Sequence, residues 1–162
     1  MSQSKIKAVF DCNIIWQSFF FGNGVAAKCK KLVDEGIITL YLSAEILEEM
    51  REVMTRPEFF AKFETVTETM VEKYLEQLVR KSVFFRSVPK KFTLSRDADD
   101  EPYINLAIEC EADYIVTRDK NLLYLMTCYD IESKEFRQKT RPLEIVEPLE
   151  FLKIVEETEK TN

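Results

Sequence analysis

The sequence predicts an α/β fold in which helices cover both faces of a central, mostly parallel sheet. Two observations support this prediction. Short apolar segments of strand length alternate with longer segments that have helical spacing, a pattern typical of chains that build parallel sheets. The chain has 162 residues and is 46% apolar, which is enough for one domain with a substantial core. We therefore expect a single domain over residues 1–162.

Five short apolar segments are the expected strands. Buried strands of parallel sheets are short, continuously apolar and bounded by polar or turn-forming residues. The segments with these properties are residues 6–10, 37–42, 83–88, 112–117 and 143–146.

The helices are predicted from apolar spacing and from terminal signals. Ser43 is a favourable N-cap, Pro57 ends one helix and opens another, and Gly36 follows a helix end. The expected helices are residues 25–34, 44–54, 67–81, 97–111 and 120–126, a short one from residue 57 and a terminal one from residue 148. We expect the charged segment 129–141 to be irregular.

The composition excludes several kinds of catalysis. The chain contains no histidine, which removes Ser-His-Asp and Cys-His chemistry, histidine bases and histidine metal sites. Carboxylates, Lys, Arg, Tyr and hydroxyls remain. The net charge of −6 argues against a uniformly basic nucleic-acid-binding surface. Local basic clusters or a bound divalent cation can offset that charge.

The cysteines and the apolar runs indicate a reducing compartment. Four cysteines lie within or beside apolar segments without CxxC spacing, so we expect reduced, mostly buried thiols. No apolar run approaches the roughly 18–20 residues of a membrane span, and residues 1–7 contain no secretory apolar region. We therefore expect a cytoplasmic protein.

Two expected strands end at an aspartate. The apolar run 8–10 stops at Asp11, with Asn13 two residues later, and Asp119 follows the strand that ends at Thr117. Ligands of open α/β sheets bind at the carboxyl ends of the strands, and a buried carboxylate needs a cation, a donor or water. Both aspartates are therefore candidate site residues. Each can instead be the N-cap of the following helix.

Two further acids lie on the inner side of their predicted helices. At about 100° per residue, Glu49 lies on the edge of the apolar face of its helix, while the other three glutamates point away. Asp100 shares a face with the apolar residues three, four, seven and eight positions later, so it faces the sheet. Asp97 precedes this helix and can reach the same place. Helix capping and surface ion pairs are the ordinary alternatives for such acids.

Four carboxylates that converge at one edge of a sheet would repel one another and resist joint ionisation. A hard divalent cation removes this conflict, and oxygen ligands without nitrogen or thiolate favour Mg²⁺ or Mn²⁺ over zinc. Such a site can activate water for an in-line displacement at phosphorus. The sequence therefore predicts nuclease or phosphatase chemistry without histidine.

Four motifs resemble those of the PIN-domain ribonucleases in order and spacing, and within that family they most resemble the toxins of toxin–antitoxin systems. The motifs are residues 9–13 (VFDCN), 43–50 (SAEILEEM), 97–107 (DADDEPYINLA) and 112–123 (ADYIVTRDKNLL). The resemblance extends over residues 6–125. Residues 145–152 also resemble the closing strand and helix of the family.

The resemblance implies a three-layer α/β/α sandwich and Mg²⁺- or Mn²⁺-dependent cleavage of single-stranded RNA. The implied catalytic acids are Asp11, Glu49, Asp100 and Asp119. Of these, Asp11, Asp100 and Asp119 would bind the metal, and Glu49 would bind metal or water. The implied supporting positions are Asn13, Asp97 and Thr117. The resemblance also implies a homo-oligomer and a small antitoxin protein that occupies the active-site groove.

Two features depart from the family: residues 129–141 resemble an insertion, and the acidic net charge is unfavourable for RNA. The candidate phosphate contacts are Lys28, Lys30, Lys31, Arg118, Lys120, Arg137, Lys139 and Arg141. A solvated surface role is the ordinary one for most such side chains.

Two other functions remain open. A haloacid-dehalogenase-type phosphatase also places an aspartate after its first strand, but it expects a second aspartate where this chain has Asn13. A PIN fold can also be a non-catalytic interaction module, although all four expected acids are present here.

Overall fold

The computed structural model describes residues 4–162, and its centre is a parallel sheet of five strands. The strands are β1 (Lys7–Phe10), β2 (Thr39–Ser43), β3 (Val83–Phe85), β4 (Tyr114–Val116) and β5 (Glu144–Val146). They lie in the order β3-β2-β1-β4-β5. Because β1 is central and all strands are parallel, the residues that follow β1, β2 and β4 meet at one edge of the sheet.

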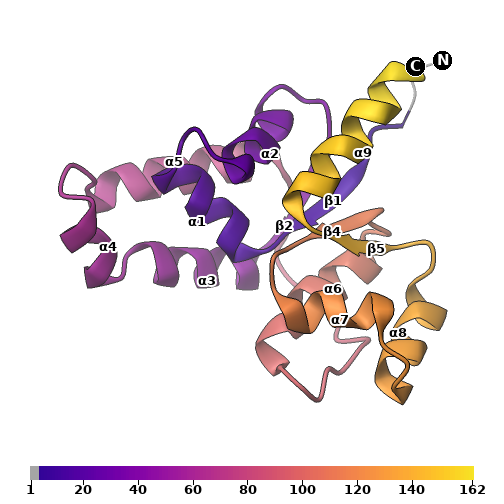
Figure 1. The fold of residues 1–162 in the computed structure, drawn as a ribbon. Helices are drawn as coiled ribbons and strands as arrows, with labels where there is room; N and C mark the ends of the chain where they lie inside the picture. The colour runs from indigo at the N-terminus through magenta and orange to yellow at the C-terminus, as the bar shows by residue number, and fades with distance from the viewer. Residues whose placement is uncertain (1–3) are drawn as a thin grey trace.

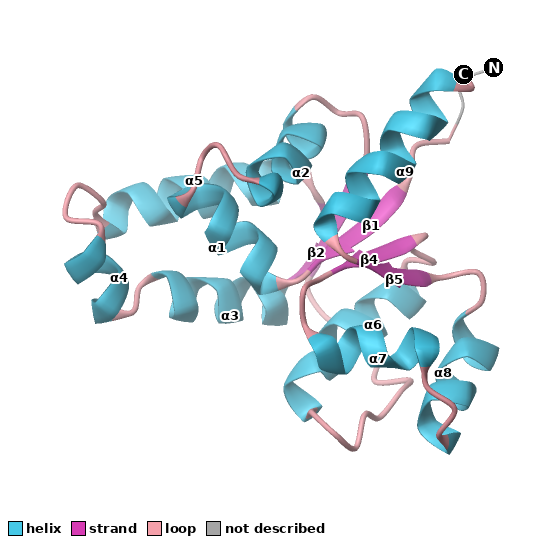
Figure 2. Ribbon diagram, in the orientation of Figure 1, coloured by secondary structure: helices cyan, strands magenta, loops and turns pink. Residues whose placement is uncertain are grey.

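Helices cover both faces of this sheet, so the protein is a three-layer α/β/α sandwich. Figure 1 shows α2 and α9 on one side and α6 and α7 on the other, and Figure 2 shows the strands between them. The helices are α1 (Cys12–Phe20), α2 (Val25–Asp34), α3 (Ala44–Met54), α4 (Pro57–Lys62), α5 (Glu68–Lys81), α6 (Glu101–Glu109), α7 (Lys120–Thr127), α8 (Ile131–Thr140) and α9 (Pro148–Lys160), with a 3₁₀ turn η1 (Ala98–Asp100). The predicted fold class is confirmed.

The core lies between the sheet and the two helical layers. On the α9 side, the ring of Phe151 meets those of Phe10 and Tyr114 edge-on, with centroids 5.8 Å from each. On the other side, Ile104 and Ala107 of α6 are almost fully buried. Full burial of a large apolar side chain such as Phe151 or Ile104 stabilises the fold by about 1.5–3 kcal/mol. Both layers are therefore anchored on the strands that carry the acidic edge.

Most of the predicted helix boundaries agree with the structure. Helix α2 has the predicted limits, and Gly36 beyond it has a φ of +70°. The Ser43 hydroxyl accepts a hydrogen bond from the Ile46 amide at 3.2 Å, which caps α3 as expected. The strands are shorter than predicted. The expected strand 83–88 ends at Phe85, because β3 is an edge strand and the chain leaves the sheet there.

The expected helix 97–111 is divided into two parts. Its first turn is the 3₁₀ helix η1, and α6 begins at Glu101. The Asp97 carboxylate accepts a hydrogen bond from the Asp99 amide, and the Asp97 carbonyl accepts one from the Asp100 amide. These contacts close a tighter turn than an α-helix has.

The prediction that residues 129–141 are irregular is wrong, because they form α8. The Asp130 carboxylate caps this helix by accepting from the Ser133 amide at 2.7 Å. Phe136 is fully buried and packs edge-on against Phe92. Because Ser133 and Thr140 fill the other buried positions, the helix lacks the apolar repeat that would reveal it in the sequence.

The cysteine prediction is confirmed, since all four are free thiols and three of them are buried. Among the helices formed by residues 4–162, none combines the length and the apolar character that crossing a membrane requires. Residues 1–3, where no secretory segment is expected, lie outside the described part of the chain.

Candidate metal centre

Three aspartates bring their carboxylates together at the carboxyl edge of the sheet. Asp97, Asp100 and Asp119 each place one oxygen within 4.8 Å of the oxygens of the other two. Asp100 is buried, with 7% of its surface exposed, and the other two are half-buried. This is the close arrangement of oxygen ligands that a hard divalent cation requires.

Helix capping and metal binding are compatible at two of these aspartates. Asp97 and Asp119 cap η1 and α7 by accepting backbone hydrogen bonds at 3.0 Å from Asp99 and at 2.7 Å from Asn121. Both caps use Oδ1, and within residues 4–162 the Oδ2 atoms of these two side chains form no hydrogen bond. The two interpretations that the sequence left open are therefore not exclusive. The caps fix the carboxylates while leaving an oxygen for a ligand.

Asp100 has a buried carboxylate oxygen that nothing in residues 4–162 compensates. Its Oδ2 is buried and has no hydrogen-bond partner in the described part of the chain. No lysine or arginine between residues 4 and 162 forms an ion pair with any acid of the edge. A buried carboxylate oxygen without a donor or cation is costly. The donor set therefore fits a bound divalent cation.

Asp11 is joined to this cluster through Thr117. The Thr117 hydroxyl donates to Asp11 Oδ2 at 2.7 Å and accepts from the Asp119 amide at 2.9 Å. Asp11 is 6% exposed and Thr117 is fully buried. The hydroxyl thus ties the end of β1 to the end of β4. The family resemblance implied Asp11 as the third metal ligand beside Asp100 and Asp119. The group of three with oxygens within 4.8 Å of one another contains Asp97 in that position.

Glu49 reaches the same edge from α3 and is held by a buried tyrosine. The Tyr103 hydroxyl donates to Glu49 Oε2 at 2.7 Å and accepts from the Cys12 amide at 3.2 Å. The spacing of Tyr103 from Asp100 in the sequence predicts that Tyr103 points inward. It does not predict the hydrogen bonds that the Tyr103 hydroxyl forms with Glu49 and Cys12. Asn13 is exposed, and its Oδ1 accepts from Trp16 Nε1 at 2.7 Å.

The acids of this edge influence one another electrostatically. Burial, followed by the charges of Asp119, Asp97, Asp11 and Glu49, raises the pKa of Asp100 to about 7. Burial also raises the pKa values of Asp11 and Glu49, against the opposing hydrogen bonds from Thr117 and Tyr103. Without a cation, the cluster therefore resists full ionisation near neutral pH.

The candidate phosphate contacts are spread over three places. Arg118 and Lys120 flank Asp119, Lys28 and Lys31 lie on α2, and Arg137 and Lys139 lie on α8. Lys30 is unsuited to this role, because it is buried and pairs with Asp34 at 2.6 Å. These contacts otherwise stay predictions.

Together, the helix-covered parallel sheet and its acidic, histidine-free edge define an α/β protein with a candidate metal site made of oxygen ligands. The chain belongs to the PIN domain family, since the family model described as PIN domain matches residues 7–121. PIN domains are generally metal-dependent nucleases. The chain is also 32% identical over 160 residues to an uncharacterized protein, MJ1680, of Methanocaldococcus jannaschii. This match covers 99% of the present chain and 96% of that protein.

Proposed function

We propose that the protein is an endoribonuclease that cleaves single-stranded RNA with Mg²⁺ or Mn²⁺. The observation that carries the proposal is the buried Oδ2 of Asp100, which lacks a partner within residues 4–162 and lies in a group of three carboxylates. In a PIN domain, this arrangement favours hydrolysis of a phosphodiester bond. RNA is the proposed substrate because the motifs resemble those of the PIN-domain ribonucleases.

Each residue of the edge has a proposed role in this reaction. Asp97, Asp100 and Asp119 would hold the cation, which when bound would polarise phosphate oxygens and favour ionisation of water. Asp11, fixed by the Thr117 hydroxyl, orients the attacking water. Glu49, fixed by Tyr103, accepts the proton of that water. The raised pKa of Glu49 makes its carboxylate a stronger base than that of an ordinary glutamate.

The proposed biological setting is a toxin–antitoxin pair in the cytoplasm. In this proposal, the protein is a homo-oligomeric toxin, and a small antitoxin protein occupies its active-site groove. The support is the resemblance of four motifs to the toxin branch of the family. Expression of the wild-type chain alone should arrest bacterial growth, and an inactive variant should not.

The test is cleavage of a mixed single-stranded RNA pool. With Mn²⁺ we expect shortened products whose ends map to internal positions, and we expect EDTA to stop the reaction. A double-stranded pool and a generic phosphate monoester are the matched controls. Hydrolysis of the monoester through a phospho-aspartate, without cleavage of RNA, would instead indicate a dehalogenase-type phosphatase.

Replacing Tyr103 with phenylalanine should lower kcat about 10- to 100-fold, the usual effect of losing a residue that orients a ligand. The change removes one hydroxyl, leaving the buried Cys12 amide and Glu49 Oε2 without that partner. We expect a stability loss of about 1–3 kcal/mol, measured by urea unfolding.

A matched control for this variant is Tyr41→Phe. Tyr41 is half-buried on β2, packs against Phe85, and its hydroxyl forms no hydrogen bond with residues 4–162. The control should keep both stability and kcat. An unchanged kcat in Tyr103→Phe would show that the hydroxyl does not position Glu49.

A further inference from the structure

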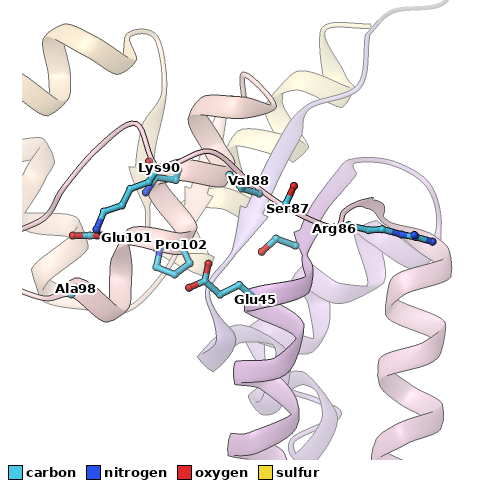
Figure 3. Close-up of a pocket in the computed structure, with 10 residues that line it drawn as sticks. Glu45, Arg86, Ser87, Val88, Lys90, Ala98, Glu101 and Pro102 are labelled. Carbon is cyan, nitrogen blue, oxygen red and sulfur yellow. Dashed lines mark ion pairs between the residues drawn. The ribbon is translucent and has the colours of Figure 1, made fainter.

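A cavity of about 380 Å³ opens at the carboxyl edge of the sheet, beside the acidic cluster. It lies between the end of β2, the chain after β3 and the first turn of α6 (Figure 3). A neighbouring cavity of about 350 Å³ shares Glu45, Ala98 and Pro102 with it and continues past Glu49. The two cavities therefore adjoin each other, and Glu49 brings the second one to the proposed catalytic edge.

One wall of this pocket is fixed by two buried polar side chains. Glu101 accepts a hydrogen bond from the Leu94 amide at 2.9 Å and pairs with Lys90 at 3.0 Å. Asn105 Oδ1 accepts from the amides of Lys91 and Phe92, each at 2.8 Å. These contacts hold the segment 90–94 against α6. The pocket is therefore formed before any ligand arrives, which lowers the cost of binding.

The charges that line the pocket disfavour a phosphate. Lys90 is neutralised by Glu101, and Figure 3 shows the Arg86 side chain extending away from both. The Glu45 carboxylate points toward Pro102 in the same view and forms no ion pair with residues 4–162. Val88, Ala98 and Pro102 supply apolar surface. The pocket therefore suits a neutral, flat group that carries hydrogen-bond donors.

We propose that this pocket is a base-recognition subsite, in which Glu45 accepts hydrogen bonds from an unstacked guanine of the RNA strand. The proposal rests on the proposed ribonuclease function. Guanine presents two adjacent donors, N1–H and N2–H, which match the two oxygens of a carboxylate, whereas each other RNA base offers a single donor group on that edge. The apolar surface of Pro102 covers the face of the base.

The experiment is sequencing of the products from a randomised single-stranded RNA cleaved with Mn²⁺. Wild type should favour guanine at one fixed position relative to the cut. Glu45→Gln should reduce this preference about tenfold, the discrimination that a bidentate pair supplies, and on a guanine-containing substrate it should raise KM more than it changes kcat. Glu48→Gln is the matched control, because Glu48 lies on the same helix, is exposed and lines neither cavity. It should keep the wild-type preference.

A second measurement does not depend on cleavage. NMR titration of metal-free protein with GMP, AMP, CMP and UMP should shift amide signals of residues 86–90 and of the start of α3, most strongly with GMP. These shifts should be lost in Glu45→Gln and kept in Glu48→Gln. Cleavage without any guanine preference, or equal loss in both variants, would overturn the subsite while leaving the nuclease intact. If wild type cleaves no RNA, the proposed function fails, and the titration alone decides whether the pocket binds guanine.

Discussion

Replacing Asp100 with asparagine is expected to lower metal-dependent RNA cleavage by about 10²- to 10³-fold, the scale of losing one preorganised electrostatic contact in an active site. The variant exchanges a charged oxygen for a neutral amide at the ligand position whose Oδ2 is buried and has no hydrogen-bond partner within residues 4–162. The remaining acids would hold the cation more weakly and with less charge. Initial rates on one fluorescent RNA, measured over a range of Mn²⁺ concentrations, would show both effects.

Asp99→Asn is the matched control for this variant. Asp99 is the neighbouring residue and loses the same charge. It lines the cavity beside Glu49, but its side chain is exposed and lies outside the group of three. We expect its rate to stay close to wild type. Equal activity in wild type and Asp100→Asn would refute the metal centre. Equal inactivity of all three proteins, with folds intact, would favour the non-catalytic interaction module.

In EDTA, the wild-type protein should lose stability as the pH rises from about 4 to about 7, and Asp100→Asn should lose less. The pKa of Asp100 is about 7 in the folded protein, against an ordinary value of 3.8. A pKa raised by folding means that the folded state binds the proton more tightly. The resulting stabilisation is present below pH 3.8 and is lost as the pH passes through 7. The raised pKa values of Asp11 and Glu49 act in the same direction.

The size of this effect is best measured as a difference between the two proteins. At pH 8 the asparagine variant should be more stable than wild type by roughly 2 kcal/mol, after allowing for partial solvent screening of the carboxylate. Thermal unfolding in EDTA at pH 5, 6, 7 and 8 would follow the difference as it grows. Mn²⁺ at pH 8 should stabilise wild type far more than the variant. Parallel pH curves for the two proteins would show that Asp100 titrates normally.

The sequence predicted the acidic edge because its signals are local. Asp11 and Asp119 each stop an apolar run, and the ends of neighbouring parallel strands meet wherever such a sheet forms. Asp100 was assigned to the inner face by helical counting. The count applies although Asp100 ends a 3₁₀ turn, because Asp100 is also the N-cap residue of α6 and its backbone is already helical.

Other parts of the site depend on contacts between distant segments. Local spacing cannot show that the hydroxyl of Tyr103 would meet Glu49, which lies 54 positions earlier. Nor can it show that Asp97 would come within 4.8 Å of Asp119, because that distance depends on how η1 and α7 are placed on the sheet. Local spacing also does not reveal helix α8, because its main apolar contact is between Phe136 and Phe92, which lies in a distant segment.

In Asp119 and Asp97, the two oxygens of one carboxylate have different roles. In each side chain, Oδ1 caps the following helix by accepting a backbone hydrogen bond, and Oδ2 is left to bind a cation. Asparagine at either position keeps an oxygen that can cap the helix, but its neutral amide nitrogen cannot bind a cation. A single oxygen-to-nitrogen exchange at Asp97 or Asp119 would therefore remove a charge from the proposed metal site while keeping the oxygen that caps the following helix.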